Sequence, residues 1–233
     1  MVFAVILAAG SGSRMKSAKI PKQFLTIAGE PIIRLTVNKF LACTKIDHIV
    51  IAAPSIWMAH TKDILSDAIY KNISICEGGQ TRQDSLYKSL KFIESSFDTD
   101  ENTIVVSHDV ARPFVSLRII EDNISGAMEA DAVDTVIPAT DTIVHSVDGS
   151  YISNIPDRSH MYQGQTPQSF KIRNFIKIYE TLDEEYLERV TDAARILAEH
   201  GQSVKLIHGE LFNIKITTEY DFRIAEFLLS ETA

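Results

Sequence analysis

The sequence predicts an α/β fold in which helices cover both faces of a mostly parallel, twisted sheet. Short apolar runs alternate with segments whose apolar residues recur at helical spacing, which is typical of β-α-β units. The run over residues 2–7 is apolar throughout, as expected of a strand buried on both faces. A length of 233 residues and a hydrophobic content of 45% suit one open sheet, so we expect residues 1–233 to form a single domain.

The first part of the chain supplies most of this sheet. Strands are expected where a short apolar run ends in a turn, and helices where apolar residues follow a period of about 3.6. The first helix has Pro31 in its first turn, where a missing N–H breaks no hydrogen bond. Strands are thus expected over residues 2–7, 48–53, 73–76, 103–107 and 132–138, and helices over 31–42, 57–70, 81–92 and 117–130.

The alternation stops between residues 139 and 165. Two stretches over 141–147 and 150–155 flank an Asp148-Gly149 pair, which favours a hairpin turn. Because a two-stranded ribbon is barely stable alone, we expect 139–165 to project as an arm that builds a homodimer. The alternative is a hairpin folded onto its own domain. Helices are then expected over 172–182, 184–200 and 219–229, with strands over 203–207 and 212–216.

Composition excludes several classes of protein. The net charge of -8 disfavours nucleic acid or an anionic membrane as partner. No run approaches the ~20 apolar residues of a membrane span, and no basic leader precedes the first strand. We therefore expect a cytoplasmic protein. Cys43 and Cys76 lie far apart in apolar surroundings, so we expect buried thiols rather than a disulfide or a metal site.

The loop after the first strand is the first candidate binding site. Gly10 and Gly12, with small neighbours, let the backbone approach a ligand with its N–H groups turned toward it. Arg14 and Lys22 bring fixed positive charge to the same loop. The pattern predicts a site for a nucleotide triphosphate, although a plain glycine turn between strand and helix is the simpler alternative.

Two better-known phosphate loops do not fit these residues. A P-loop requires Gly-Lys-Ser/Thr, whereas Gly12 is followed by Ser13 and Arg14. A dinucleotide fingerprint requires a third glycine or alanine, where this chain has Met15, and a helix that starts at once, which Pro21 prevents.

Three later loops carry further candidates. Gly78-Gly79 precedes a helix and permits close backbone approach, and Ser85 adds a hydroxyl. Asp109 ends a strand, where its carboxylate can meet a Mg²⁺ ion that rides on phosphates. Arg112 is placed to contact a second substrate, or else to pair with Asp109 and stabilise the turn.

The last candidate cations lie in the second half of the chain. Arg158 stands beside a polar run over residues 162–168. Lys215 lies inside an expected buried strand, and a buried lysine needs a partner such as phosphate.

Taken in order along the chain, these motifs resemble the cytidylyltransferases that act on sugar-alcohol phosphates. The similarity spans nearly the whole chain, and the combination of five separated motifs is specific. The motifs are residues 7–14 with 21–23, Gly78-Gly79 with Arg82 and Ser85, His108-Asp109 with Arg112-Pro113, residues 165–168, and residues 213–215.

Two branches of this family compete, with ribitol 5-phosphate or 2-C-methylerythritol 4-phosphate as the acceptor. The sequence is more similar to the ribitol branch at residues 112–114, 118–120, 132–136, 141–144, 155–158 and 161–170. Two further hypotheses stay open: a dinucleotide-dependent oxidoreductase on the same fold, and a nucleotide sensor without catalytic activity.

The resemblance implies a Rossmann-like fold, a homodimer built through the arm, and reaction of CTP with D-ribitol 5-phosphate. The products would be CDP-ribitol and pyrophosphate, with Mg²⁺ as cofactor. The implied catalytic residues are Arg14, Lys22, Arg158 and Lys215; the CTP-binding residues are Leu7, Ala8, Ala9, Gly10, Gly12, Gly78, Gly79, Arg82, Asp84, Ser85 and Ala111; and the acceptor-binding residues are Asp109, Arg112, Asp141, Thr166 and Thr191, with Asp109 also the metal neighbour.

Overall fold

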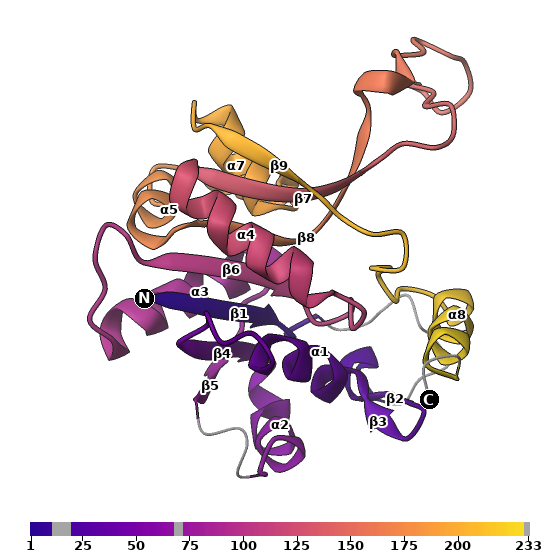
Figure 1. The fold of residues 1–233 in the computed structure, drawn as a ribbon. Helices are drawn as coiled ribbons and strands as arrows, with labels where there is room; N and C mark the ends of the chain where they lie inside the picture. Colours follow the sequence, from indigo (N-terminus) through magenta and orange to yellow (C-terminus); the bar gives the residue numbers. More distant parts are fainter. Residues whose placement is uncertain (11–19, 68–71, 231–233) are drawn as a thin grey trace.

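A seven-stranded sheet forms the centre of the molecule (Figure 1). The computed structural model describes residues 1–10, 20–67 and 72–230. The strand order is β5-β4-β1-β6-β8-β7-β9, and β8 alone runs antiparallel to its two neighbours. The strands are β1 (Val2–Leu7), β4 (His48–Ala53), β5 (Ile73–Glu77), β6 (Ile104–Asp109), β7 (Ala132–Pro138), β8 (Tyr162–Lys171) and β9 (Val204–His208).

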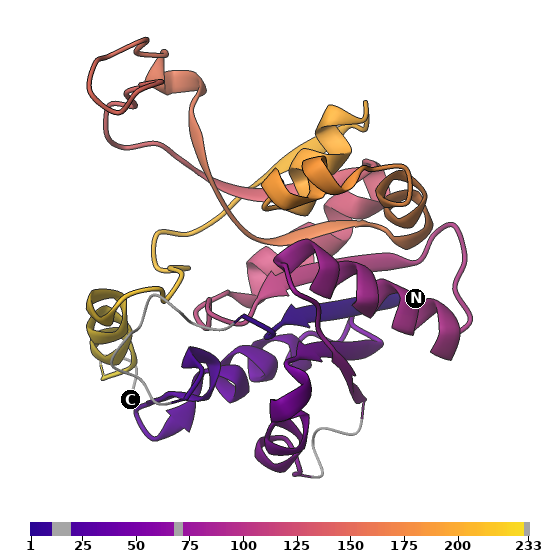
Figure 2. The same ribbon diagram turned by 180° about the vertical axis from the view of Figure 1, so that it is seen from behind.

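Helices pack on both faces of the sheet, as predicted (Figures 1 and 2). Alternate residues of β1 explain this arrangement: Ala4 and Ile6 join the apolar layer under α1 and α4, while Phe3 and Val5 join the layer under α3, α5 and α7. The helices are α1 (Ile32–Leu41), α2 (Met58–Ile64), α3 (Arg82–Ser96), α4 (Leu117–Glu129), α5 (Ile172–Tyr179), α6 (Glu184–Arg189), α7 (Ala193–Glu199) and α8 (Glu219–Ser230).

A separate two-stranded sheet and the apolar cluster beneath it lie at one end of the main sheet. The two-residue strands β2 (Thr26–Ile27) and β3 (Glu30–Pro31) pair with each other, and Ile27 packs in a separate apolar cluster with Ile216 and Ala225 of the C-terminal region. This cluster joins α8 to the segment that follows the first-strand loop, whereas the N-terminus lies on the opposite side of the molecule (Figure 2).

Strand β8 is the main element that sequence analysis missed. Residues 162–168 were described only as a polar run with no strand assigned, but β8 lies between β6 and β7 in the sheet and pairs with both. The polar side chains are buried because each finds a partner: Gln168 donates to Asp134, and Ser169 donates to Asn123.

Two predictions for the C-terminal region are wrong. The expected helix over 184–200 breaks at Val190, which is buried, and Asp192 caps the new helix α7 by accepting from the N–H of Arg195. The expected strand over 212–216 is an irregular segment, held by backbone hydrogen bonds at its two ends.

Residues 139–161 leave the sheet between β7 and β8 as a projecting arm (Figure 1). The turn at Gly149 has a positive φ of 73°, as an Asp-Gly turn requires. The two expected strands do not form: one bridge joins His145 to Asn154, and Asp148 accepts from the N–H groups of Ser150 and Tyr151 instead. The described arm is therefore a loop with a single bridge rather than a ribbon.

Two smaller predictions have clear outcomes. Both cysteines are free and buried, as expected. Among the described residues, we find no helix that is both long enough and apolar enough to cross a bilayer.

Candidate active site

A cleft of about 670 Å³ opens where β1, β5 and β6 end. Parallel strands place their carboxyl ends at one edge of the sheet, and ligands of such sheets bind there. The cleft is lined by eleven of the predicted residues: Leu7, Ala9, Gly10, Lys22, Gly78, Gly79, Arg82, Ser85, Asp109, Ala111 and Lys215. The predicted residues Gly12 and Arg14 lie outside the described residues.

The glycine turn before α3 forms one wall of the cleft. Ser85 Oγ accepts a hydrogen bond from the N–H of Gly79 at 2.9 Å and donates to the carbonyl of Thr81 at 2.8 Å. Asp84 accepts from the N–H of Gln80, while the Thr81 hydroxyl accepts from the N–H of Asp84. The side chains of Asp84 and Ser85 thus shape the turn, and a Cβ at Gly78 or Gly79 would overlap neighbouring side chains.

A buried carboxylate holds two cations at the floor of the cleft. Asp109 Oδ1 lies 2.8 Å from Nε of Arg82, and its Oδ2 lies 2.7 Å from Nζ of Lys215. Burial alone would raise the pKa of Asp109, but the charges of Arg82 and Lys215 lower this pKa well below its ordinary value. Two cations from distant parts of the chain, Arg82 and Lys215, are therefore fixed beside one carboxylate.

The prediction that Asp109 meets a Mg²⁺ ion carried on the substrate phosphates stays a prediction. Both oxygens of Asp109 already face cations, and the described ranges contain no group of three His, Cys, Asp or Glu side chains able to hold a metal. The chain itself thus offers no preformed metal site among these residues.

His108 holds the strand end that carries Asp109. Its Nε2 donates to the carbonyl of Arg112 at 3.0 Å, and Thr166 Oγ1 donates to its Nδ1 at 3.0 Å. The same Thr166 oxygen accepts from the N–H of Asp109. Burial lowers the pKa of His108 to about 4, so the ring is neutral near pH 7. The hydroxyl of Thr166, which is predicted to bind the acceptor, thus makes hydrogen bonds to His108 and Asp109 in this structure.

Lys22 reaches the C-terminal side of the cleft. Its Nζ donates to the carbonyl of Ile216 at 3.0 Å, one residue beyond Lys215. The neighbouring Gln23 is buried and donates to the carbonyls of Ala8 and Gly10, which fixes the exit of β1. No role was predicted for Gln23 from the sequence, although it stands in the motif over residues 21–23 beside Lys22.

Several predicted residues lie outside the cleft lining. Arg112 is half-buried and donates to the carbonyl of Asn213. Arg158 and Asp141 are exposed in or at the base of the arm, where Arg158 donates to the carbonyl of Thr140, and Thr191 is exposed between α6 and α7. Ala8 is buried beneath the loop. The cleft lining does not bring these residues together with Lys22 and Lys215.

The fold and this cleft define a class: an α/β protein that binds a nucleotide at the carboxyl ends of its parallel strands. Residues 2–231 match the IspD family, described as 2-C-methyl-D-erythritol 4-phosphate cytidylyltransferase. The chain belongs to this family, and it is a CTP-dependent cytidylyltransferase.

Solved structures agree with this assignment. The chain is 29% identical to 4-diphosphocytidyl-2C-methyl-D-erythritol synthase from Anaerococcus prevotii, with a TM-score of 0.83 over 99% of this chain and 98% of that one. It is 27% identical to 2-C-methyl-D-erythritol 4-phosphate cytidylyltransferase from Francisella tularensis, with a TM-score of 0.80 over 97% of this chain and 98% of that one. The predicted fold class and enzyme class are confirmed.

Proposed function

We propose that this enzyme transfers the cytidylyl group of CTP to the phosphate of an acyclic polyol phosphate. The observation that supports this most directly is the convergence of Lys22, Arg82 and Lys215 on one cleft, from three distant parts of the sequence. Three cations in one cleft suit a triphosphate and a second phosphate together.

The triphosphate would lie along the two glycine turns. Gly10 and Gly78-Gly79 line the cleft, and α3 begins directly after the second turn. Free N–H groups at a helix N-terminus favour anions, and the absent Cβ atoms allow close approach.

The proposed step needs no covalent intermediate. An oxygen of the acceptor phosphate bonds to the α-phosphorus of CTP, the bond from that phosphorus to the bridging oxygen breaks, and pyrophosphate leaves. Negative charge gathers between two anionic reactants, so Lys22 and Lys215 act by position and charge rather than by proton transfer. Arg14 is proposed to join them. We further propose that Mg²⁺ enters with CTP.

Two acceptors are candidates. The family description and the similar structures name 2-C-methyl-D-erythritol 4-phosphate, and so support this acceptor more directly. D-Ribitol 5-phosphate is supported by the sequence resemblance at residues 155–158 and 161–170, and identities below 30% to the named enzymes leave room for a different acceptor. Both are acyclic polyol phosphates and would present the same attacking group.

A turnover assay tests this proposal. Pyrophosphate release from CTP is measured with each of the two polyol phosphates, with and without Mg²⁺. We expect release with one acceptor to exceed release with the other by at least tenfold in kcat/KM. Release with neither acceptor would contradict the proposal.

We also propose that residues 1–233 act as a single domain whose arm pairs with a second copy. Large apolar side chains on the arm are exposed, among them Val147 at 83%, Tyr151 at 78% and Ile152 at 64%. Arg158 lies on the same arm, so a role at an acceptor site would need the cleft of that second copy. Sedimentation of a Val147→Asp, Ile152→Asp variant should show a monomer beside a wild-type dimer; a monomeric wild type would contradict the proposal.

A further inference from the structure

The segment over residues 209–217, here called the lysine segment, carries one side of the cleft. Lys215 extends from it to Asp109 at 2.7 Å, and the carbonyl of Ile216 accepts from Lys22 at 3.0 Å. The segment has no helix or strand of its own. Side chains outside it must therefore help to fix the position of both lysines.

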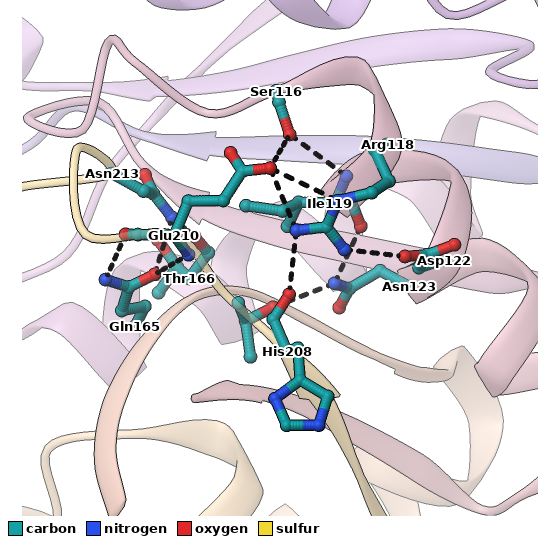
Figure 3. Close-up of polar contacts among 11 residues, drawn as sticks. Ser116, Arg118, Ile119, Asp122, Asn123, Gln165, Thr166, His208, Glu210 and Asn213 are labelled. Carbon is teal, nitrogen blue, oxygen red and sulfur yellow. Dashed lines mark hydrogen bonds and ion pairs between the residues drawn. The ribbon is translucent and has the colours of Figure 1, made fainter. Parts of the chain in front are cut away.

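The side-chain amide of Gln165 makes three hydrogen bonds to the lysine segment (Figure 3). Its Nε2 donates to the carbonyl of Glu210 at 2.9 Å. Its Oε1 accepts from the N–H of Glu210 at 3.3 Å and from Nδ2 of Asn213 at 3.1 Å. A Cβ at Gly209 would overlap Gln165 Oε1, so the glycine leaves room for this amide.

Gln165 also links the lysine segment to the strand that supports Asp109. It is 6% exposed on β8, next to Thr166, whose hydroxyl accepts from the N–H of Asp109. Asn213, which is fully buried, donates in addition to the carbonyl of Thr166. The two partners of the Asp109–Lys215 ion pair are thus attached to neighbouring residues of one strand.

An outer ion pair supports the same segment from the helix side (Figure 3). Glu210 accepts from Arg118 at 2.9 Å and from Ser116 at 3.0 Å, while Arg118 also donates to the carbonyl of His208. Arg118 is about half exposed, so solvent weakens this pair. The buried amide of Gln165 is the stronger restraint of the two.

We propose that Gln165 is a positioning residue that sets the place of Lys215 at the reacting phosphates. This inference rests on the proposed role of Lys215 in cytidylyl transfer. Gln165 touches no reacting atom in this arrangement; it acts through the lysine segment. Catalysis by position and charge is sensitive to displacements of about 1 Å, so loss of three bonds to this segment should slow the step itself.

The test is a double-mutant cycle of Gln165→Met with Lys215→Ala. Methionine keeps the length of the side chain and removes the amide. We expect Gln165→Met to lower kcat about tenfold while the KM for CTP changes less than about threefold, because Lys215 acts mainly in the transition state. In the Lys215→Ala background the same change should lower kcat less than twofold, since the residue it positions is gone. Single-turnover measurement with radiolabelled CTP extends the range to slow variants.

Asn123→Leu provides the matched control for a loss of stability. Asn123 is fully buried and makes three hydrogen bonds, to Ile119, Thr135 and Ser169, none of them to the lysine segment. We expect it to lower Tm while kcat per folded enzyme stays within twofold of wild type. If Gln165→Met does not fold, Gln165→Asn replaces it. The shorter asparagine side chain keeps an amide that cannot reach Glu210 and Asn213, so the same fall in kcat is expected.

The outcomes distinguish a failure of the role of Gln165 from a failure of the role of Lys215. Equal loss from Gln165→Met with and without Lys215 would overturn the inference, because Gln165 would then act independently; so would an unchanged kcat. Full kcat in Lys215→Ala alone would refute the proposed role of Lys215 and the inference with it.

Discussion

Replacing Asp109 by asparagine tests how strongly one buried carboxylate stabilises the two cations beside it. The carboxylate is 7% exposed and lies within 2.8 Å of both Arg82 and Lys215. The variant removes the negative charge and turns one oxygen into an NH₂ group, so only one of the two cations keeps an acceptor. The cations are then left to repel each other.

The expected loss follows from burial and charge. Breaking a fully buried pair from one side costs about 3–5 kcal/mol. Here the side chains of Lys215 and Arg82 are 35% and 21% exposed, so water offsets part of that loss. We expect a loss of about 2–3 kcal/mol, which for a chain of this length lowers Tm by about 4–12 °C.

Thermal unfolding followed by circular dichroism measures this loss, with Asp122→Asn as the matched control. Asp122 pairs with Arg118 at 2.9 Å, but both side chains are about 45% exposed, so its loss should stay below about 1 kcal/mol. Because the folded pKa of Asp109 is lowered, its contribution is present above the unfolded pKa of ~3.9 and is lost as the pH falls further. Equal shifts for both variants, or a stabilised Asp109→Asn protein, would refute the reasoning.

Three further predictions follow from the cleft. Lys22→Ala should lower kcat by about 10²–10³ while the circular dichroism spectrum is unchanged, by analogy with donors to developing negative charge; a near-normal kcat would exclude the role. Because His108 has a pKa lowered to about 4 by burial, the unfolded chain binds its proton first, so stability should fall by up to about 3 kcal/mol as the pH drops from ~6.5 to 4. The denaturant midpoint of the His108→Gln variant should fall less than that of the wild type over that pH range. Equal dependence of the two midpoints on pH would contradict the assignment of the effect to His108. Gly78→Ala places a Cβ against that of Ala9, so the turn must shift; the variant should raise the KM for CTP about tenfold and also lower Tm. An unaltered KM would mean that CTP does not lie along this turn.

Much of the sheet could be predicted because its strands follow simple apolar patterns. The strands at residues 48–53 and 132–138 have the predicted bounds, since each is a short segment of mostly apolar residues between turn signals. Parallel strands bring their carboxyl ends together, so the convergence of Lys22, Asp109 and Arg82 could also be expected from the order of elements.

The other features of the fold and site depend on hydrogen-bond partners that lie far away in the sequence, and no local sequence pattern reveals these partners. Strand β8 reads as polar because Gln165 and Gln168 are buried only through hydrogen bonds to residues 24 to 48 positions away. Lys215 seemed to belong to a strand because apolar residues flank it, yet Ile214 and Ile216 lie in an irregular segment. Gln23 and Gln165 form hydrogen bonds to segments that line the cleft. Their positions within the motifs were the only sequence features that indicated a role for them.

The position of β8 between β6 and β7 has a consequence for the growing chain. β6 forms the border of the half-sheet made by β5, β4 and β1, and its other partner is supplied only by residues 162–171. A nascent polypeptide that ends in the arm would therefore present an open hydrogen-bonding edge of apolar residues 104–106, which other chains can pair with. Fragments truncated before residue 162 should accordingly aggregate, whereas those that extend past β8 should gain solubility.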